Sequence, residues 1–198
     1  MTVLPDNSQA ARNPMAMPVT HNGQQWSNAA EDTIDLVEPD SSWPDQFAAE
    51  SRAIKKVLHP LDPRIEHFGS TAIPKLPAKP IIDIFIIIGD VSVWPHLVAP
   101  LSSLGYIHWA GNPRTDRMFF VKGMPPFGRR RSHHVHVRTL ADTTELDFRD
   151  WLRGHPADAA RYAKVKRELV ERFKTDREAY TKAKGKFIQQ IVRQTKTY

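Results

Sequence analysis

The chain has 198 residues, of which 40% are hydrophobic and 25% are charged, proportions that fit an ordinary globular protein with a substantial core. It contains no cysteine, which excludes a disulfide framework, a thiolate metal site and a thiol nucleophile. The 28 lysines and arginines exceed the 22 acidic residues, and this excess favours phosphate-bearing partners from nucleotides to RNA, with a solvated basic surface as the simpler alternative.

The amino-terminal segment is rich in Pro, Asn, Ser, Gln and Ala and lacks apolar periodicity. We therefore expect a disordered leader over residues 1–32 and one folded domain over residues 33–198. The segment shows no basic patch followed by a hydrophobic stretch, and no apolar run in the chain reaches the ~18 residues that span a bilayer. These features predict a cytoplasmic protein without a membrane partner.

The first half of the folded region contains clear strand and helix signals. Residues 34–37 predict a short strand, and residues 43–58 predict a helix that begins at a Ser-Trp-Pro-Asp sequence and has one apolar face. Residues 64–68 predict a strand that ends in the Gly-Ser-Thr turn at 69–71. Residues 81–88, dominated by β-branched isoleucine, predict a fully buried strand.

The second half of the chain changes from strand to helix patterns. One broken helix, three strands and a helical extension are predicted in turn, over 93–104, 106–109, 117–121, 133–138 and 146–198. Strand alternation places His134 and His136 on one face of the last strand.

Asp83 lies inside the predicted buried strand. A carboxylate in such a strand costs free energy unless it is paired, hydrogen-bonded or bound to a metal, so Asp83 is the first candidate functional residue. The residue two positions further on, which shares its face, is Phe85 rather than a second carboxylate.

The turn before this strand is the second candidate. Backbone N–H groups of Gly69, Ser70 and Thr71, together with two hydroxyls, could hold an oxyanion, and Lys75 or Lys79 could offset its charge. An ordinary strand-to-helix turn is the alternative. The sequence is not a Walker P-loop, because the Gly-Lys-Ser/Thr element is absent.

The sequence HFGSTAIPKLPAKPIIDI, residues 67–84, resembles the GrpB family, and its strand, Gly-Ser turn and aspartate-bearing strand resemble the signature of the nucleotidyltransferase fold. A Trp-Pro pair at 43–44, the FRD segment at 148–150 and two Tyr-x3-Lys spacings extend the resemblance to about residues 36–192. It implies an α/β fold: a nucleotidyltransferase-like mixed sheet of about five strands with flanking helices and a helical C-terminal extension.

The resemblance also implies roles for site residues. Asp83 would ligate a divalent cation, Ser70 would hold phosphate and Lys79 would offset charge. From the residues themselves, Asp83 with His134 and His136 could form a three-ligand site, which would suit Zn, Mn, Fe or Ni better than Mg because Mg prefers oxygen ligands. The expected cofactor is thus a divalent metal, with Mg, Mn and Zn as the candidates. Alternatively, the two histidines could hydrogen-bond to Asp83 or to a bound phosphate without any metal.

Other polar residues are weaker candidates. His67 could be a general base beside the expected pocket, or a hydrogen-bonded structural histidine. Arg149 could reach a phosphate, or could pair with Asp150 and fix its helix beside the sheet. The candidates for the rim of the pocket, which match the spacing of the family, are Lys166, Tyr180 and Lys184.

The predicted function is binding of a nucleotide or another phosphorylated small molecule, with metal-dependent nucleotidyl transfer as its enzymatic form. Two-metal transfer requires several carboxylates, and the pattern supplies one at the expected place. The alternatives are a non-catalytic module that binds a nucleotide or a CoA-like ligand, and an RNA-associated protein that uses its basic helices.

Overall fold

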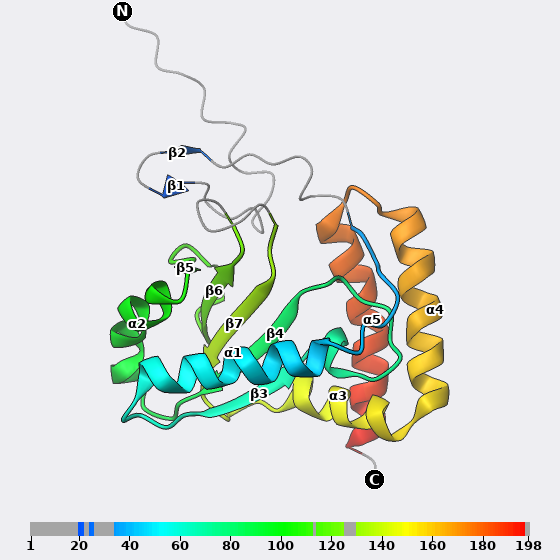
Figure 1. Ribbon diagram of the computed structural model, residues 1–198. Helices are drawn as coiled ribbons and strands as arrows, with labels where there is room; N and C mark the ends of the chain where they lie inside the picture. Colours follow the sequence, from blue (N-terminus) through cyan, green and yellow to red (C-terminus); the bar gives the residue numbers. More distant parts are fainter. Residues whose placement is uncertain (1–19, 22–23, 26–33, 113, 125–129, 197–198) are drawn as a thin grey trace, which may run out of the picture.

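The computed structural model describes residues 20–21, 24–25, 34–112, 114–124 and 130–196 (Figure 1). Its centre is a five-stranded mixed sheet in the order β3-β4-β7-β6-β5. β4 and β7 run parallel, and the other neighbouring pairs of this sheet run antiparallel. The strands are β3 (Arg64–Phe68), β4 (Ile82–Ile87), β5 (Tyr106–His108), β6 (Met118–Lys122) and β7 (His133–Arg138).

Helices flank this sheet. α1 lies along β3 and β4, α2 lies near the β5 edge, and α4 and α5 stand together at the other end of the sheet (Figure 1). α3, α4 and α5 pack against one another and form the predicted helical C-terminal extension. The helices are α1 (Trp43–Leu58), η3 (Ser70–Ala72), η4 (Val91–Leu97), α2 (Val98–Ser103), α3 (Thr144–Gly154), α4 (Pro156–Arg172) and α5 (Arg177–Thr195).

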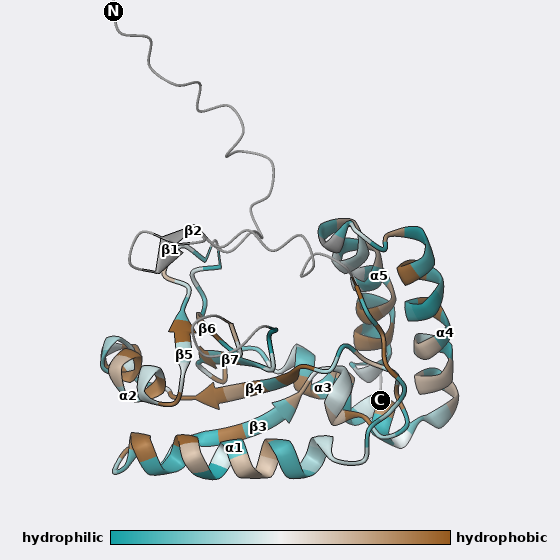
Figure 2. Ribbon diagram, turned by 45° about the horizontal axis from the view of Figure 1, so that its top comes forward, coloured by the Kyte–Doolittle hydropathy of each residue, from teal (hydrophilic) through white to brown (hydrophobic). Residues whose placement is uncertain are grey.

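β4 is apolar on both faces because both faces are covered. Ile84 and Ile86 are fully buried in the main core, which α1 and α2 share with the sheet. On the opposite face, Phe85 stacks on Phe68 with ring centroids 3.7 Å apart, and Leu146 of α3 completes this smaller core. Figure 2 accordingly shows β4 in the hydrophobic colour along most of its length.

The sequence predicted most of these elements, and the α/β class with a mixed sheet and flanking helices is confirmed. The predicted broken helix is two short pieces, η4 and α2, each with an internal proline. The predicted strand over 34–37 is wrong, since only Val37 forms a β-bridge, to Ala78. Ile34 instead donates its backbone N–H to the carbonyl of Lys174, so this segment crosses between two distant parts of the chain.

Most of the predicted leader, 1–32, lies outside the described residues. The described part is β1 (Thr20–His21) and β2 (Gln24–Gln25), which pair antiparallel. Within the described residues, no helix combines the length and the apolar character that crossing a membrane requires.

Candidate functional site

Asp83 and His134 meet across the parallel pair β4 and β7. The strand register places them side by side, and His134 Nδ1 donates a hydrogen bond of 3.0 Å to Asp83 Oδ1. Burial acts to raise the pKa of Asp83, but this hydrogen bond and the nearby positive charges outweigh it and hold the pKa below its usual value. Asp83 is therefore ionised at neutral pH and partly accessible.

The 69–71 turn closes over Asp83. Gly69 has φ 72°, and a Cβ added to it would lie 2.3 Å from Asp83 Oδ2. Only glycine allows this conformation and this close approach together. After Gly69, the η3 turn brings Ser70 and Thr71 beside the carboxylate, so that the turn and the aspartate form one unit.

A cavity of about 310 Å³ opens beside this unit, between the sheet and the helices α4 and α5. We call it the Asp83 cavity. It gathers nine of the residues predicted from the sequence: Ser70, Thr71, Lys79, Asp83, His134, His136, Lys166, Tyr180 and Lys184. The other predicted residues are Gly69, which lies against Asp83, and His67 and Arg149, which lie elsewhere.

Positive side chains dominate the lining of the Asp83 cavity. Asp83 is its only carboxylate among the described lining residues, whereas the basic side chains are four: Lys79, Arg131, Lys166 and Lys184. The amines of Lys79 and Lys184 lie 5.4 and 5.6 Å from the centre of the Tyr180 ring. This arrangement attracts an anion and holds two of the cations in place.

Lys166 is the most deeply buried of these cations, at 1% exposed. Its amine donates to the carbonyl of Pro77 and lies 5.0 Å from the centre of the Tyr162 ring. No carboxylate among the described residues forms an ion pair with it. Burial, with a further contribution from Lys184, lowers the pKa of Lys166 to about 6. Without a ligand this amine is therefore largely neutral at pH 7, and a bound anion would favour its protonated, positively charged form.

His67 does not line the Asp83 cavity, which corrects its expected position. The β3–β4 register pairs Phe68 with Asp83 and His67 with Ile84, so alternation turns the His67 ring to the opposite face of the sheet. The ring stacks on Phe47 with centroids 4.7 Å apart. Burial lowers the pKa of His67 to about 4, and the ring is therefore neutral at pH 7.

The tautomer of His67 follows from its neighbour. Thr71 Oγ1 donates its single hydrogen to the carbonyl of Ile81 at 3.2 Å, so His67 Nε2 donates to Thr71 Oγ1 at 3.0 Å. This is the hydrogen-bonded structural arrangement that the sequence left open, and the role of general base stays a prediction.

Arg149 fixes α3 to the sheet. It donates to both carboxylate oxygens of Asp150 at 2.7 and 2.9 Å, to Glu66 at 2.8 Å and to the carbonyl of His67 at 2.7 Å. These bonds use four of its five N–H donors, and the side chain is buried. The geometry therefore matches the ion-pair alternative rather than contact with a phosphate in the Asp83 cavity.

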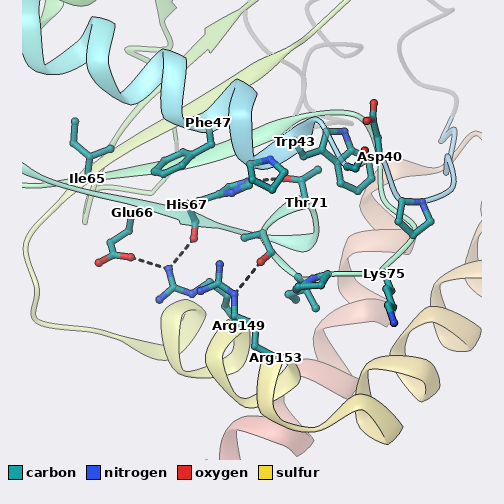
Figure 3. A pocket seen from close by; sticks show the side chains of 16 residues that line it. Asp40, Trp43, Phe47, Ile65, Glu66, His67, Thr71, Lys75, Arg149 and Arg153 are labelled. Atoms are coloured by element: carbon teal, nitrogen blue, oxygen red, sulfur yellow. Dashed lines mark hydrogen bonds and ion pairs between the residues drawn. The ribbon is translucent and has the colours of Figure 1, made fainter.

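His67 and Arg149 line a second, larger cavity of about 770 Å³, on the other side of the 69–71 turn (Figure 3). We call it the Trp43 cavity. Its lining includes the apolar residues Trp43, Phe47, Ile65 and Ile73 and the polar residues Glu66, His67, Lys75, Arg149 and Arg153. Thr71 lines both cavities.

The sequence missed six lining residues of the Asp83 cavity, among them the aromatic residues Trp109 and Phe119 and the basic residue Arg131. Phe119 lies opposite His136 in the β6–β7 register, so alternation along β6 would have found it once that pairing was known. The nitrogens Trp109 Nε1 and His136 Nδ1 are buried without a hydrogen-bond partner among the described residues. A ligand or water with polar atoms could satisfy them.

The donor set does not match a site built for Mg²⁺. Phe85 occupies the position of a second carboxylate, and His136 packs edge-on against Phe68 and Phe85. Burial lowers the pKa of His136 to about 3. Within the described part of the chain, no three His, Asp or Glu side chains are grouped as metal ligands. The three-ligand site of Asp83, His134 and His136 stays a prediction, and we derive no catalytic step from a metal.

The sheet order, the turn and the aspartate strand define a nucleotidyltransferase-like α/β domain. A solved structure of the Cid1 poly(U) polymerase with Mg 3'-dATP bound superposes with a TM-score of 0.50 at 10% identity, covering 75% of this chain and 49% of that one. At this identity the likeness shows the fold alone.

The family follows from closer matches. The GrpB protein family model matches residues 33–194, so this chain belongs to the GrpB family, as its sequence predicted. The crystal structure of conserved protein GrpB from Enterococcus faecalis has a TM-score of 0.72 at 30% identity, covering 81% of this chain and 96% of that one.

Two curated relatives illustrate the similarity. A UPF0157 protein of Pseudomonas aeruginosa is 52% identical over 176 residues, which cover 88% of this chain and 73% of the relative. A dephospho-CoA kinase of Mycolicibacterium paratuberculosis is 30% identical over 205 residues, which cover 91% of this chain and 50% of the kinase. The chain thus spans about half the length of that kinase.

Proposed function

We propose that the Asp83 cavity binds a phosphorylated small molecule, with a nucleotide as the first candidate. The observation that carries this proposal is the excess of four basic side chains over one carboxylate among the described lining residues. Phosphate groups combine high negative charge with several acceptor oxygens, which suits a cavity lined by lysines and by a turn with backbone N–H groups and hydroxyls.

The positions of the groups suggest how such a ligand lies. Its phosphates would lie between the η3 turn and the amines of Lys166 and Lys184, where the countercharge of Lys166 is missing. The indole of Trp109 and the ring of Phe119 lie at the far wall of the same cavity. They offer apolar surface and one unused N–H donor to the remainder of the ligand.

Nucleotidyl transfer is the second candidate, favoured by the contact between Asp83 and the Gly69 turn. The nucleotidyltransferase signature assigns phosphates to that turn and a cation to that aspartate. Binding ranks ahead of transfer because one carboxylate does not supply the oxygen ligands that two cations require. The likeness to a dephospho-CoA kinase makes a CoA-like ligand the alternative to a nucleotide.

A thermal-shift screen tests the proposal with nucleotides and CoA derivatives, each with Mg, Mn, Zn or no metal. A ligand at ~100 times its dissociation constant should stabilise the fold by about 2.7 kcal/mol. The Lys184→Met variant should lose most of this shift, whereas Lys182→Met, an exposed lysine of the same helix, should keep it.

The Asp83→Asn variant distinguishes nucleotidyl transfer from ligand binding without catalysis. Loss of a metal-dependent shift in this variant would support transfer and justify an assay of nucleotide turnover, whereas a shift without metal would support a binding module. If no ligand shifts the wild type, or if Lys184→Met responds like the wild type, the proposal fails. Binding of RNA that weakens steeply with salt would then favour the RNA-associated alternative.

A further inference from the structure

The Trp43 cavity differs from the Asp83 cavity in its chemistry. Its volume of about 770 Å³ lies within the range of small-molecule sites, and most of its wall is apolar. In Figure 3, Trp43, Phe47 and Ile65 lie on one side of the cavity and Arg149 and Arg153 lie on the other. A ligand with one apolar part and one polar part would match these two walls.

The apolar wall is flat and uncharged. Trp43 and Phe47 are four residues apart on α1 and therefore share one face of that helix. The imidazole of His67 stacks on one face of the Phe47 ring with an interplanar angle of 10°, which fixes the plane of that ring and leaves its other side to the cavity. Burial keeps this imidazole neutral at pH 7. Such a wall favours a planar aromatic group.

The polar wall contains one guanidinium with donors to spare. Carboxylates and a carbonyl engage four of the five N–H donors of Arg149, whereas the described contacts of Arg153 use two of its five. Arg153 Nε donates to the carbonyl of Ala72 at 2.9 Å, and Nη1 lies 3.4 Å from Asp150. Arg153 is also partly exposed, so a ligand can reach it.

The charged groups around Arg153 do not fully neutralise its positive charge. Burial and the adjacent Arg149 lower the pKa of Arg153, which means that an anion beside it would be favourable. The carboxylates of the lining are engaged elsewhere: Glu66 accepts from Arg149, and Asp40 accepts from the backbone N–H of Ser42. Asp150 accepts from both arginines. Glu66 also accepts from Arg64, so three guanidinium groups share the two carboxylates of Glu66 and Asp150 and one positive charge is left over.

We propose that the Trp43 cavity is a second ligand site, which takes an aromatic monocarboxylate with its ring on Trp43 and Phe47 and its carboxylate on Arg153. The guanidinium fork matches the two oxygens of a carboxylate. The site lies on the opposite side of the 69–71 turn from the Asp83 cavity, and this inference does not depend on the function proposed there.

Calorimetric titration with 2-naphthoate tests the inference, with 2-naphthylmethanol as the uncharged probe. The wild type should bind the carboxylate at least tenfold more tightly than the alcohol, since a charged hydrogen bond is lost in the alcohol. Arg153→Gln should remove this preference. Arg52→Gln, which changes an exposed arginine of α1, should leave it unchanged.

A second measurement on the wild type avoids any effect of Arg153→Gln on folding. Nuclear Overhauser contacts from 2-naphthoate should reach the Trp43 indole and the Phe47 ring. The inference is overturned if the wild type does not bind 2-naphthoate at millimolar concentration, if acid and alcohol bind equally, or if these contacts fall on other residues.

Discussion

On one side of the 69–71 turn, four cationic side chains share a cavity with a single carboxylate; on the other side, Arg149 is enclosed by two carboxylates and a carbonyl. Arg149 and Lys166 are both buried basic side chains, at 6% and 1% exposed. Arg149 has anionic partners and joins α3 to the sheet, whereas Lys166 has a carbonyl and a ring face. Burial alone therefore does not distinguish a structural basic residue from one that is available to a ligand. The presence or absence of carboxylate partners makes that distinction.

The largest effect on stability should come from replacing Arg149, the buried cation that has carboxylate partners. Arg149→Met removes a donor that Glu66, Asp150 and the His67 carbonyl share, and should lower the free energy of unfolding by about 3 kcal/mol. Urea denaturation monitored by circular dichroism measures the change. Arg161→Met, which removes an exposed ion pair with Asp158, should cost less than about 1 kcal/mol. Equal losses in the two variants would contradict the assigned role of Arg149.

A smaller effect is expected at the boundary between the cavities. Gly69→Ala introduces a side chain at positive φ and forces a methyl group against Asp83, which should cost about 2 kcal/mol and weaken ligand binding in the Asp83 cavity. Gly185→Ala on α5 is the matched control, because no atom lies within 4 Å of its added Cβ. That change should stabilise the protein by about 0.5–1 kcal/mol. Unchanged stability of Gly69→Ala in the same urea experiment would refute the close contact.

Lys166→Met tests the buried lysine that has no carboxylate partner among the described residues. Unlike the two changes above, it should raise the stability of the protein. The pKa of Lys166 is lowered to about 6 in the folded state from 10.5, so between these pH values the unfolded chain binds a proton that the folded chain does not. Wild-type stability should therefore rise with pH across this window.

At pH 7 the methionine variant should be more stable than the wild type by about 1–2 kcal/mol, because it removes the cost of burying an uncompensated amine. Melting temperatures at pH 7 and pH 9.5 measure the difference, which should shrink at the higher pH. Ligand binding should weaken in the same variant. A destabilised Lys166→Met would show that the amine already has its countercharge.

The sequence predicted the main residues of the Asp83 cavity because the patterns that indicate them are local. The isoleucine run fixed β4, alternation put His134 and His136 on one face, and the resemblance joined them to Asp83. The face of His67 depended instead on the β3–β4 register, which the long connection between those strands leaves open. Phe119 and Arg131 were missed for the same reason, since their places follow from the pairing around β7.

The parallel pairing of β4 with β7 sets an order for the synthesis of the molecule. Asp83 and His134 are 51 positions apart, so the ribosome releases the aspartate and its turn well before their histidine partner. Lys166 and Lys184 follow later still, on α4 and α5. A nascent chain can therefore complete its sheet before it has the side chains that give the Asp83 cavity its positive charge.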